Sequence, residues 1–289
     1  MIFAPDSLSG KHIVVTGASS GLGQAAAVHL SALGANLSIV GRDEGRLGAT
    51  LSSLAGGGTH AAHAADVGEF GGAGALIQRV VTERGAIDGL FHSAGSSLVM
   101  PMRLTKEAQI DDLFGAAVMG ALGMAKALSR KAAMNDRGSL VFMSSVSAVR
   151  GRRGMVPYSA AKAATSGMVR ALAIELAERR IRVNSITAGA VETAMHKSFV
   201  DSVSDELVAG YRDLHPLVFG RFGGALMQFH RERVQANFAS HLTYKHAIFQ
   251  PLHLPARVPV PDIHGHMFRL SGHCTKRVYA KLMLARQTR

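Results

Sequence analysis

The sequence contains one cysteine and no tryptophan among its 289 residues. A single thiol excludes an internal disulfide framework and is typical of a reducing compartment. Charged residues make up 18% of the chain and hydrophobic residues 47%, which excludes a largely disordered chain or a coiled coil. No apolar run reaches the ~20 residues of a membrane-spanning helix, and the first residues lack the basic and apolar regions of a signal peptide. We therefore expect a cytoplasmic protein that does not associate with a membrane.

Acidic residues are scarce toward the C-terminus. Residues 221–289 hold 11 Lys or Arg and 2 Asp or Glu, whereas residues 1–220 hold 21 and 18. The formal net charge of +12 therefore comes mainly from the last segment. That segment has neither interleaved aromatic residues nor a recognisable nucleic-acid motif, so we expect no nucleic-acid partner. Salt-sensitive DNA retention that disappears when residues 222–289 are removed would revive that hypothesis.

Short β-branched apolar runs alternate with longer helical stretches between residues 11 and 187. Strands are expected at 12–16, 36–40, a weaker run ending near 65, 87–91, 139–143 and 182–186. Helices are expected at 21–33, 43–54, 73–84, 106–134 and 158–179. This alternation predicts an α/β fold in which helices cover both faces of a doubly wound parallel sheet. Ligands of such sheets bind beyond the carboxyl ends of the strands.

A glycine-rich loop follows the first predicted strand and leads into a helix. Glycines allow a backbone to approach a pyrophosphate closely, and the helix supplies free N–H groups and the positive end of its dipole. The alternative interpretation is a plain β–α turn. We predict a dinucleotide site formed by Gly17, Ser19, Ser20, Gly21, Leu22 and Gly23.

The end of the second predicted strand indicates which dinucleotide is bound. Folds that bind NAD usually place a carboxylate there to bond the ribose hydroxyls, but no acid occupies positions 40–42. Arg42 suits the additional phosphate of NADP, so NADP(H) is favoured over NAD(H). A solvated surface arginine is the alternative.

Three residues form a candidate catalytic set. Ser145 follows the fifth predicted strand, and Tyr158 and Lys162 lie four positions apart on one face of the next helix. An ammonium group beside a phenol is expected to lower the tyrosine pKa from ~10. Tyr158 would then act as a general acid toward a forming alkoxide, while Ser145 hydrogen-bonds the oxyanion. A solvated Tyr–Lys pair is the alternative interpretation of this spacing alone.

Taken together, the glycine loop and the Ser–Tyr–Lys set resemble the short-chain dehydrogenase/reductase family over about residues 8–221. The resemblance implies a Rossmann fold, usually of seven strands, of which six are visible here. It implies homodimers or homotetramers and a hydride-transfer reaction. It also implies that Tyr158 and Lys162 contact the cofactor. Further cofactor contacts are implied for Asp66, Val67, Ala94, Gly95, Gly189, Val191 and Thr193.

The sequence departs from the family pattern at several positions. His92 and Ser93 replace two asparagines, and we expect His92 to hold loop structure rather than act as a base. Ala188 replaces a proline, which predicts a less rigid loop. Ala117 stands where the family has an asparagine that completes a proton path, so we expect reduced rather than absent activity.

The resemblance ends near residue 221. We therefore divide the chain into a Rossmann-type catalytic domain, 1–221, and an atypical basic, histidine-rich segment, 222–289. A reading-frame change or an authentic tail that binds a partner would each explain this segment. His264, His266, His273 and Cys274 match no standard zinc spacing, so no metal site is predicted.

The predicted function is NADPH-dependent reduction of a ketone or 3-oxoacyl carbonyl on a small-molecule substrate, with Tyr158 as proton donor. The sequence is similar in style to 3-oxoacyl carrier-protein reductases, an analogy only. The alternative is a dinucleotide-binding sensor or scaffold whose catalysis is weakened or lost. The run from Arg150 to Arg153 is either a solvated loop or an attractor for an acidic carrier protein or substrate.

Overall fold

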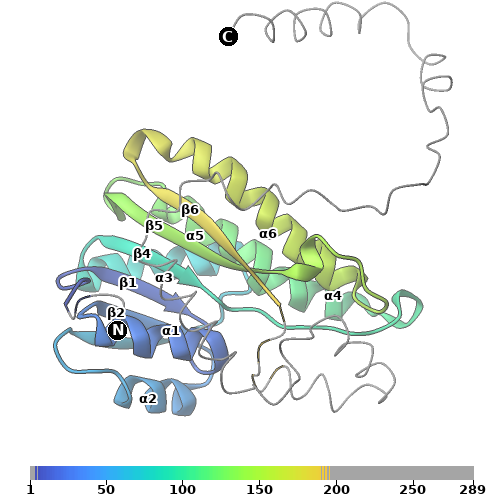
Figure 1. The fold of residues 1–289 in the computed structure, drawn as a ribbon, viewed down its shortest axis with the longest axis horizontal. Helices are drawn as coiled ribbons and strands as arrows, with labels where there is room; N and C mark the ends of the chain where they lie inside the picture. The colour runs from blue at the N-terminus through green and yellow to red at the C-terminus, as the bar shows by residue number, and fades with distance from the viewer. Residues whose placement is uncertain (1–3, 5, 190, 192, 194, 196–289) are drawn as a thin grey trace, which may run out of the picture. The chain divides into compact units, whose positions relative to one another are not determined.

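The computed structural model describes residues 4, 6–189, 191, 193 and 195, and six strands of this part form one parallel sheet in the order β3-β2-β1-β4-β5-β6 (Figure 1). The predicted doubly wound α/β fold is confirmed. The strands are β1 (His12–Thr16), β2 (Asn36–Gly41), β3 (His60–Ala64), β4 (Ile87–His92), β5 (Met134–Ser145) and β6 (Arg182–Ala188).

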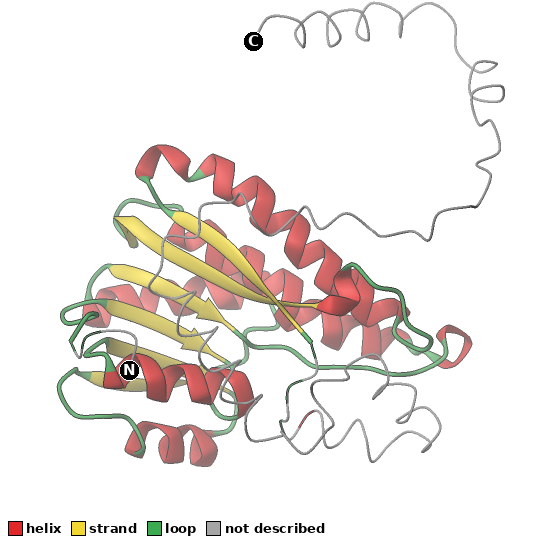
Figure 2. Ribbon diagram, viewed as in Figure 1, coloured by secondary structure: helices red, strands yellow, loops and turns green. Residues whose placement is uncertain are grey.

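Helices cover both faces of the sheet, as Figure 2 shows. Alternate strand residues point to opposite faces, so Val14 packs in one hydrophobic core with α3, α5 and α6, whereas Val15 packs in the other with α1 and α2. The helices are α1 (Gly21–Ala32), α2 (Glu44–Ser52), α3 (Phe70–Arg84), α4 (Glu107–Phe114), α5 (Ala121–Leu128) and α6 (Val156–Glu175). Short 3-10 turns are η1 (Met102–Leu104), η3 (Val146–Ala148) and η4 (Ala177–Arg179).

The sheet has its topological switch point at β1. The chain runs outward from β1 through β2 to β3, and then returns to place β4 on the other side of β1. The loops after β1 and β4 therefore diverge at one edge of the sheet and leave a crevice between them. This edge is where the carboxyl ends of all six strands meet.

The helix predicted over about 106–134 is present from Glu107 to Leu128, but it ends six residues early and contains a π-helical turn. α4 ends at Phe114, a π-helical turn η2 (Gly115–Gly120) follows, and α5 ends at Leu128. A Cβ atom at Gly120 would overlap the carbonyl oxygen of Val67, and one at Gly115 would lie 3.1 Å from the carbonyl oxygen of Gly68. The wide turn thus brings the helix backbone against the loop after β3, a contact that local sequence does not encode.

β5 begins five residues earlier than predicted. Its pairing with β4 shifts register between Ile87 and Gly89, and Arg137 has a φ of +64° in the irregular stretch. No helix among the described residues combines the length and the apolar character needed to cross a bilayer. The predicted tail, 222–289, lies outside the described residues, and with it His264, His266, His273 and Cys274, for which no metal site is predicted. Residues 196–221 of the predicted catalytic domain also lie outside them.

Candidate active site

A cleft of about 1050 Å³ opens at the carboxyl ends of the strands. It is lined by loops that follow all six strands, so residues far apart in the sequence meet there. Gly23 lies behind the glycine loop and does not line the cleft. The predicted site residues that line it are Gly17, Ser19, Ser20, Gly21, Leu22, Arg42, Asp66, Val67, Ala94, Gly95, Ser145, Tyr158, Lys162, Gly189, Val191 and Thr193.

The glycine loop is shaped by close backbone contacts. Gly17 and Gly21 have φ values of +66° and +55°, which glycine adopts without strain. A Cβ atom at Gly17 would lie 2.8 Å from the backbone nitrogen of Ala94, and one at Gly23 would overlap the carbonyl oxygen of Gly17. Ser20 precedes α1 and makes no capping bond with its side chain. The N–H groups of the first helical turn lack a side-chain cap, which fits the pyrophosphate of a dinucleotide.

The end of β2 carries an arginine and an acid that is already engaged. The Asp43 carboxylate caps α2 by accepting from the Arg46 N–H at 2.8 Å and forms an ion pair with the Arg46 guanidinium at 2.9 Å. The backbone N–H of Arg46 holds the Asp43 pKa below its ordinary value. Arg42 has a looser partner, the Asp66 carboxylate at 3.9 Å, and both side chains are exposed. Such a pair contributes little stability, so Arg42 is available to a ligand.

A buried hydrogen-bond network connects the two loops at the switch point. The Thr16 Oγ1 accepts the N–H groups of Ser93 and Ala94, each at 3.2 Å, and lies 2.9 Å from the His92 Nδ1. The His92 Nε2 lies 2.9 Å from the carbonyl oxygen of Ala116 in η2. A carbonyl only accepts, so the proton is on Nε2, and the Thr16 hydroxyl donates to Nδ1.

This network assigns His92 a structural role, as predicted. Burial lowers its pKa to about 4, so the ring is neutral at pH 7. The ring is tied at both nitrogens and does not line the cleft. Sequence reasoning did not identify Thr16 as part of the site, although a threonine at the end of a buried strand was a usable signal.

We expect the protein to lose stability as the pH falls from about 6.5 toward 4. In the unfolded chain His92 takes up a proton near 6.5, but the folded protein resists this until about 4. Its share of the free energy of unfolding should fall by about 2 kcal/mol between about pH 7.5 and 5. Urea unfolding at both pH values measures the change.

The control for this prediction is His92→Asn. Burial also lowers the pKa values of His12 and His63, so these residues contribute a pH dependence to both proteins. The difference between the two proteins isolates His92. An identical loss of stability in the variant would contradict the assignment.

The two serines at the end of β5 have different roles. The Ser144 hydroxyl donates to the Lys162 carbonyl oxygen at 3.0 Å and lies 2.9 Å from the Ser166 hydroxyl, so it holds α6 against β5. The Ser145 Oγ accepts the Ser147 N–H at 3.2 Å and also hydrogen-bonds the Tyr158 phenol. The geometry therefore favours Ser145 over Ser144 as the residue beside the phenol.

Lys162 is buried next to Tyr158. Its Nζ donates to the Met143 carbonyl oxygen at 3.0 Å and lies 5.8 Å from the centroid of the Tyr158 ring. Burial lowers the Lys162 pKa to about 8, so most molecules carry the charge at pH 7.

The predicted lowering of the Tyr158 pKa is wrong for the structure as it stands. Burial raises the Tyr158 pKa, and the hydrogen bond with Ser145 only opposes this shift. The Lys162 ammonium is engaged with the Met143 carbonyl. Tyr158 therefore keeps its proton at neutral pH, which suits a proton donor.

Ala117 is buried behind the cleft wall, next to Gly95, which lines the cleft. A Cβ atom at Gly95 would be 3.6 Å from the Lys162 Nζ and 4.0 Å from the Ala117 Cβ. The Ala117 carbonyl oxygen accepts from the Thr165 hydroxyl at 3.2 Å. Position 117 thus contributes a methyl group and no side-chain polar atom. Among the described residues, no three His, Cys, Asp or Glu side chains gather as metal ligands.

Comparison with known proteins places this site in context. A family model described as short chain dehydrogenase matches residues 11–204. A glucose 1-dehydrogenase of Gluconobacter oxydans is 31% identical over 199 residues, which make up 68% of this chain and 75% of that protein. The 3-oxoacyl-[acyl-carrier-protein] reductase FabG of Escherichia coli is 30% identical over 219 residues, 76% of this chain and 86% of the relative.

Solved structures show the same fold. A short chain dehydrogenase of Shigella flexneri complexed with NADP has a TM-score of 0.60 at 30% identity, covering 70% of this chain and 87% of its own. An NAD⁺-bound xylitol dehydrogenase has a TM-score of 0.59 at 27% identity, and the match covers 63% of this chain and 71% of that protein. Similar proteins therefore bind either cofactor, and the preference depends on individual residues of this chain.

Proposed function

This chain belongs to the short-chain dehydrogenase/reductase family and is an NAD(P)-dependent oxidoreductase, and we propose that it uses NADPH to reduce a ketone or 3-oxoacyl carbonyl with Tyr158 as proton donor. One observation carries the proposal. Ser145, Tyr158 and Lys162 line the same cleft as the glycine loop, so a carbonyl placed beside the phenol also faces the dinucleotide site. The cofactor supplies the hydride when it is bound.

Each of the three residues has a separate task in the proposed mechanism. Ser145 donates a hydrogen bond to the carbonyl oxygen and positions it at the Tyr158 hydroxyl. The raised pKa of Tyr158 keeps the phenol protonated until negative charge develops on that oxygen, when the proton moves from phenol to alkoxide. The buried Lys162 ammonium then stabilises the phenolate left behind.

The preference for NADPH is supported by the residues at the end of β2. The Asp43 carboxylate is held by Arg46 and does not face a ribose hydroxyl as a free acceptor. Arg42 lines the cleft with only a weak ion pair to Asp66. A guanidinium in this place suits bidentate binding of a phosphate on the 2′ oxygen.

Arg42→Ala is expected to weaken NADPH binding roughly 10- to 100-fold while changing NADH binding less than about threefold. The loss corresponds to one charge-assisted hydrogen-bond pair to a phosphate. Fluorescence titration with both cofactors measures it. Arg79→Ala removes an exposed arginine from α3, outside the cleft, and should change neither affinity. If Arg42→Ala weakened the binding of NADPH and NADH equally, this residue would not bind the 2′-phosphate.

The proposed activity is tested by following NADPH and NADH oxidation with a panel of ketones and 3-oxoacyl thioesters. We expect NADPH-dependent turnover, at a rate reduced by the missing amide at Ala117. Tight NADPH binding without turnover of any compound in the panel would overturn the reductase proposal and favour a dinucleotide sensor.

A further inference from the structure

Two loops beside Tyr158 are held together as one unit. One loop follows β4 and spans residues 93–106, and the other spans residues 146–155 before α6. The Met100 N–H donates to the Gly154 carbonyl oxygen at 2.8 Å. Gly154 has a φ of +79°, and a Cβ atom there would lie 3.3 Å from the Val99 side chain. The side chains of both loops therefore share one rim of the cleft.

This rim is basic. Neither loop contains Asp or Glu, and Arg152 lines the cleft together with Tyr158. Among the described residues, no ion pair joins the other four basic side chains to a carboxylate. The basic rim is defined as the basic residues of these two loops, of which Arg152 lines the cleft and the other four lie outside its lining: Arg103, Lys106, Arg150, Arg152 and Arg153.

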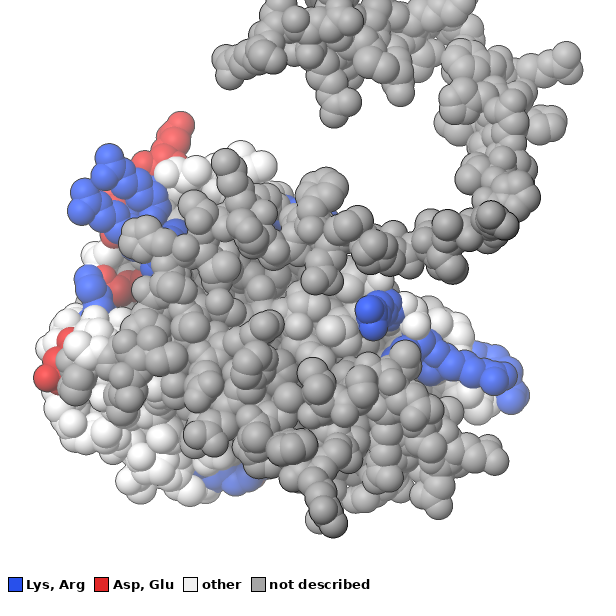
Figure 3. Space-filling view, viewed as in Figure 1, with Lys and Arg blue, Asp and Glu red and all other residues white. Residues whose placement is uncertain are grey.

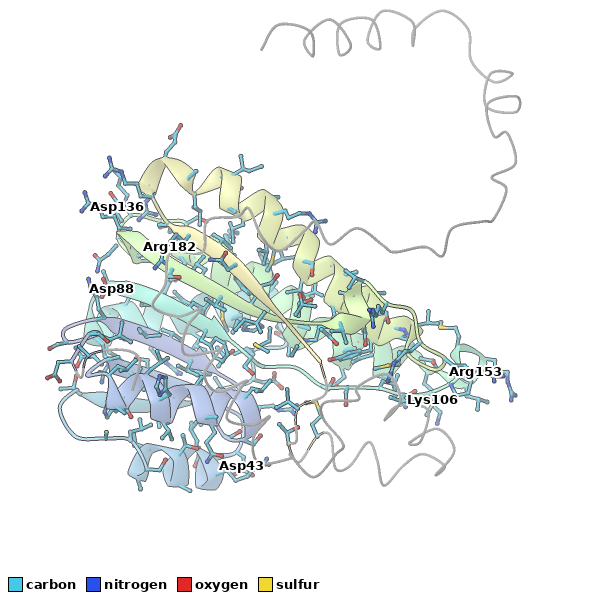
Figure 4. The ribbon with its side chains drawn as sticks, in the orientation of Figure 1. Asp43, Asp88, Lys106, Asp136, Arg153 and Arg182 are labelled. Carbon is cyan, nitrogen blue, oxygen red and sulfur yellow. The ribbon has the colours of Figure 1, made fainter. Side chains whose placement is uncertain are left out.

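The figures show where part of this basic rim lies. In Figure 4 the labelled Lys106 and Arg153 lie at one end of the molecule, whereas Asp136 and Arg182 lie at the opposite end. In Figure 3 blue side chains gather at the right-hand end of the visible face, and no red side chain lies among them there. Like charges repel one another, so an anion placed among them is stabilised. The nearest acids in the sequence, Glu107, Asp111 and Asp112, lie on α4 and not on either loop.

The rim is separate from the part of the cleft that fits the cofactor phosphates. The glycine loop and Arg42 follow β1 and β2, whereas the basic rim extends from β4 and β5. β1 separates β2 from β4 in the sheet. The basic rim is thus placed to bind a second anion, on the side where the carbonyl substrate meets Tyr158.

We infer that the substrate carries a phosphate or carboxylate group remote from its carbonyl, and that the basic rim binds this group. The inference rests on the proposed reductase function, since it names the substrate class of the same site. The anionic group belongs either to a small molecule or to an acidic carrier protein, which present the same chemistry to the rim. Long-range attraction raises the rate of encounter and weakens as salt screens it.

A matched pair of substrates tests this inference. Acetoacetyl-coenzyme A and the acetoacetyl thioester of N-acetylcysteamine present the same reacting carbonyl, but only the first carries phosphates. At low salt we expect kcat/KM to be at least about tenfold higher for the coenzyme A thioester, with a steep decrease as salt is added. The double variant Arg150→Gln/Arg153→Gln should remove most of this difference in kcat/KM by raising the KM of the coenzyme A thioester.

Controls isolate the charge effect. The neutral thioester should keep its kcat/KM within about twofold in the double variant. Arg182 is an exposed arginine at the other end of the sheet, and Arg182→Gln should leave the kcat/KM of both thioesters unchanged. Equal kcat/KM values for both thioesters, or a parallel loss for both in the double variant, would overturn the inference. Adding the acetoacetyl carrier protein as a third substrate distinguishes the two sources of the anion.

A binding measurement separates this inference from the proposed function. Calorimetric titration of coenzyme A into the protein saturated with NADP⁺ should show binding that weakens about tenfold in the double variant. If neither thioester is turned over but coenzyme A binding depends on the two arginines, the reductase proposal fails and the anion site stands. If coenzyme A binds both proteins equally or binds neither, the anion site is refuted whatever the activity.

Discussion

Tyr158→Phe is expected to lower kcat by about 10²- to 10⁴-fold, the range that a positioned general acid contributes. The substitution removes one oxygen and keeps the ring that packs beside the Lys162 ammonium at 5.8 Å. NADPH affinity and thermal stability should therefore change little. Stopped-flow measurement of a single turnover reports the chemical step directly, even where product release limits kcat.

The pH dependence gives this prediction a second readout. Tyr158 has a raised pKa and Lys162 a pKa of about 8, so the reduction rate of the native enzyme should decrease above about pH 8 as Lys162 loses its proton. The residual rate of Tyr158→Phe should not follow this profile, since it has no phenolate to stabilise. A variant that retains both the rate and the pH profile of the native enzyme would exclude Tyr158 as the donor.

Gly23→Ala is expected to weaken cofactor binding by at least about 100-fold and to lower the free energy of unfolding by roughly 1–3 kcal/mol. The added Cβ would overlap the carbonyl oxygen of Gly17 and lie 3.0 Å from that of Thr16. Neither carbonyl can move without displacing the glycine loop, because Gly17 already packs closely against the backbone of Ala94. A Cβ atom added at Gly17 would lie 2.8 Å from the Ala94 backbone nitrogen. Cofactor titration and urea unfolding measure the two effects.

Gly48→Ala is the matched control for this substitution. Gly48 lies inside α2, and a Cβ atom there meets no other atom within 4 Å. Alanine should therefore raise the free energy of unfolding by up to about 1 kcal/mol through its higher helix propensity, with cofactor affinity unchanged. If Gly23→Ala behaved like Gly48→Ala, the tight turn would not be what holds the cofactor loop in place.

The fold was predictable because its signals are local and repeated. Each strand is a short apolar run, such as Ile13–Val15, bounded by residues that end it, and each crossover is long enough for one helix. The cleft was predictable for a related reason. In a parallel sheet all carboxyl ends meet at one edge, so residues that follow strands, such as Arg42 and Ser145, converge there.

Features that depend on tertiary contact were not predictable. The π-helical turn η2 forms where Gly115 and Gly120 meet the backbone after β3, and the helical pattern of the sequence contains no trace of that approach. The direction of the Tyr158 pKa shift was missed because spacing reveals a neighbouring lysine but not the depth of burial. The partners of His92 were equally hidden, since they lie on β1 and η2.

The hydrogen bond from the Met100 N–H to the Gly154 carbonyl has a consequence for protein engineering. A chimera that receives only one of the two loops from a relative with other loop lengths would leave a donor or an acceptor without its partner, which costs about 1–3 kcal/mol where the group is buried. Residues 93–106 and 146–155 should therefore be transplanted together. Because neither loop contains a residue of the Ser145–Tyr158–Lys162 set, these three side chains of the recipient stay in place, whereas Ala94 and Gly95, which line the cleft, are transferred with the first loop.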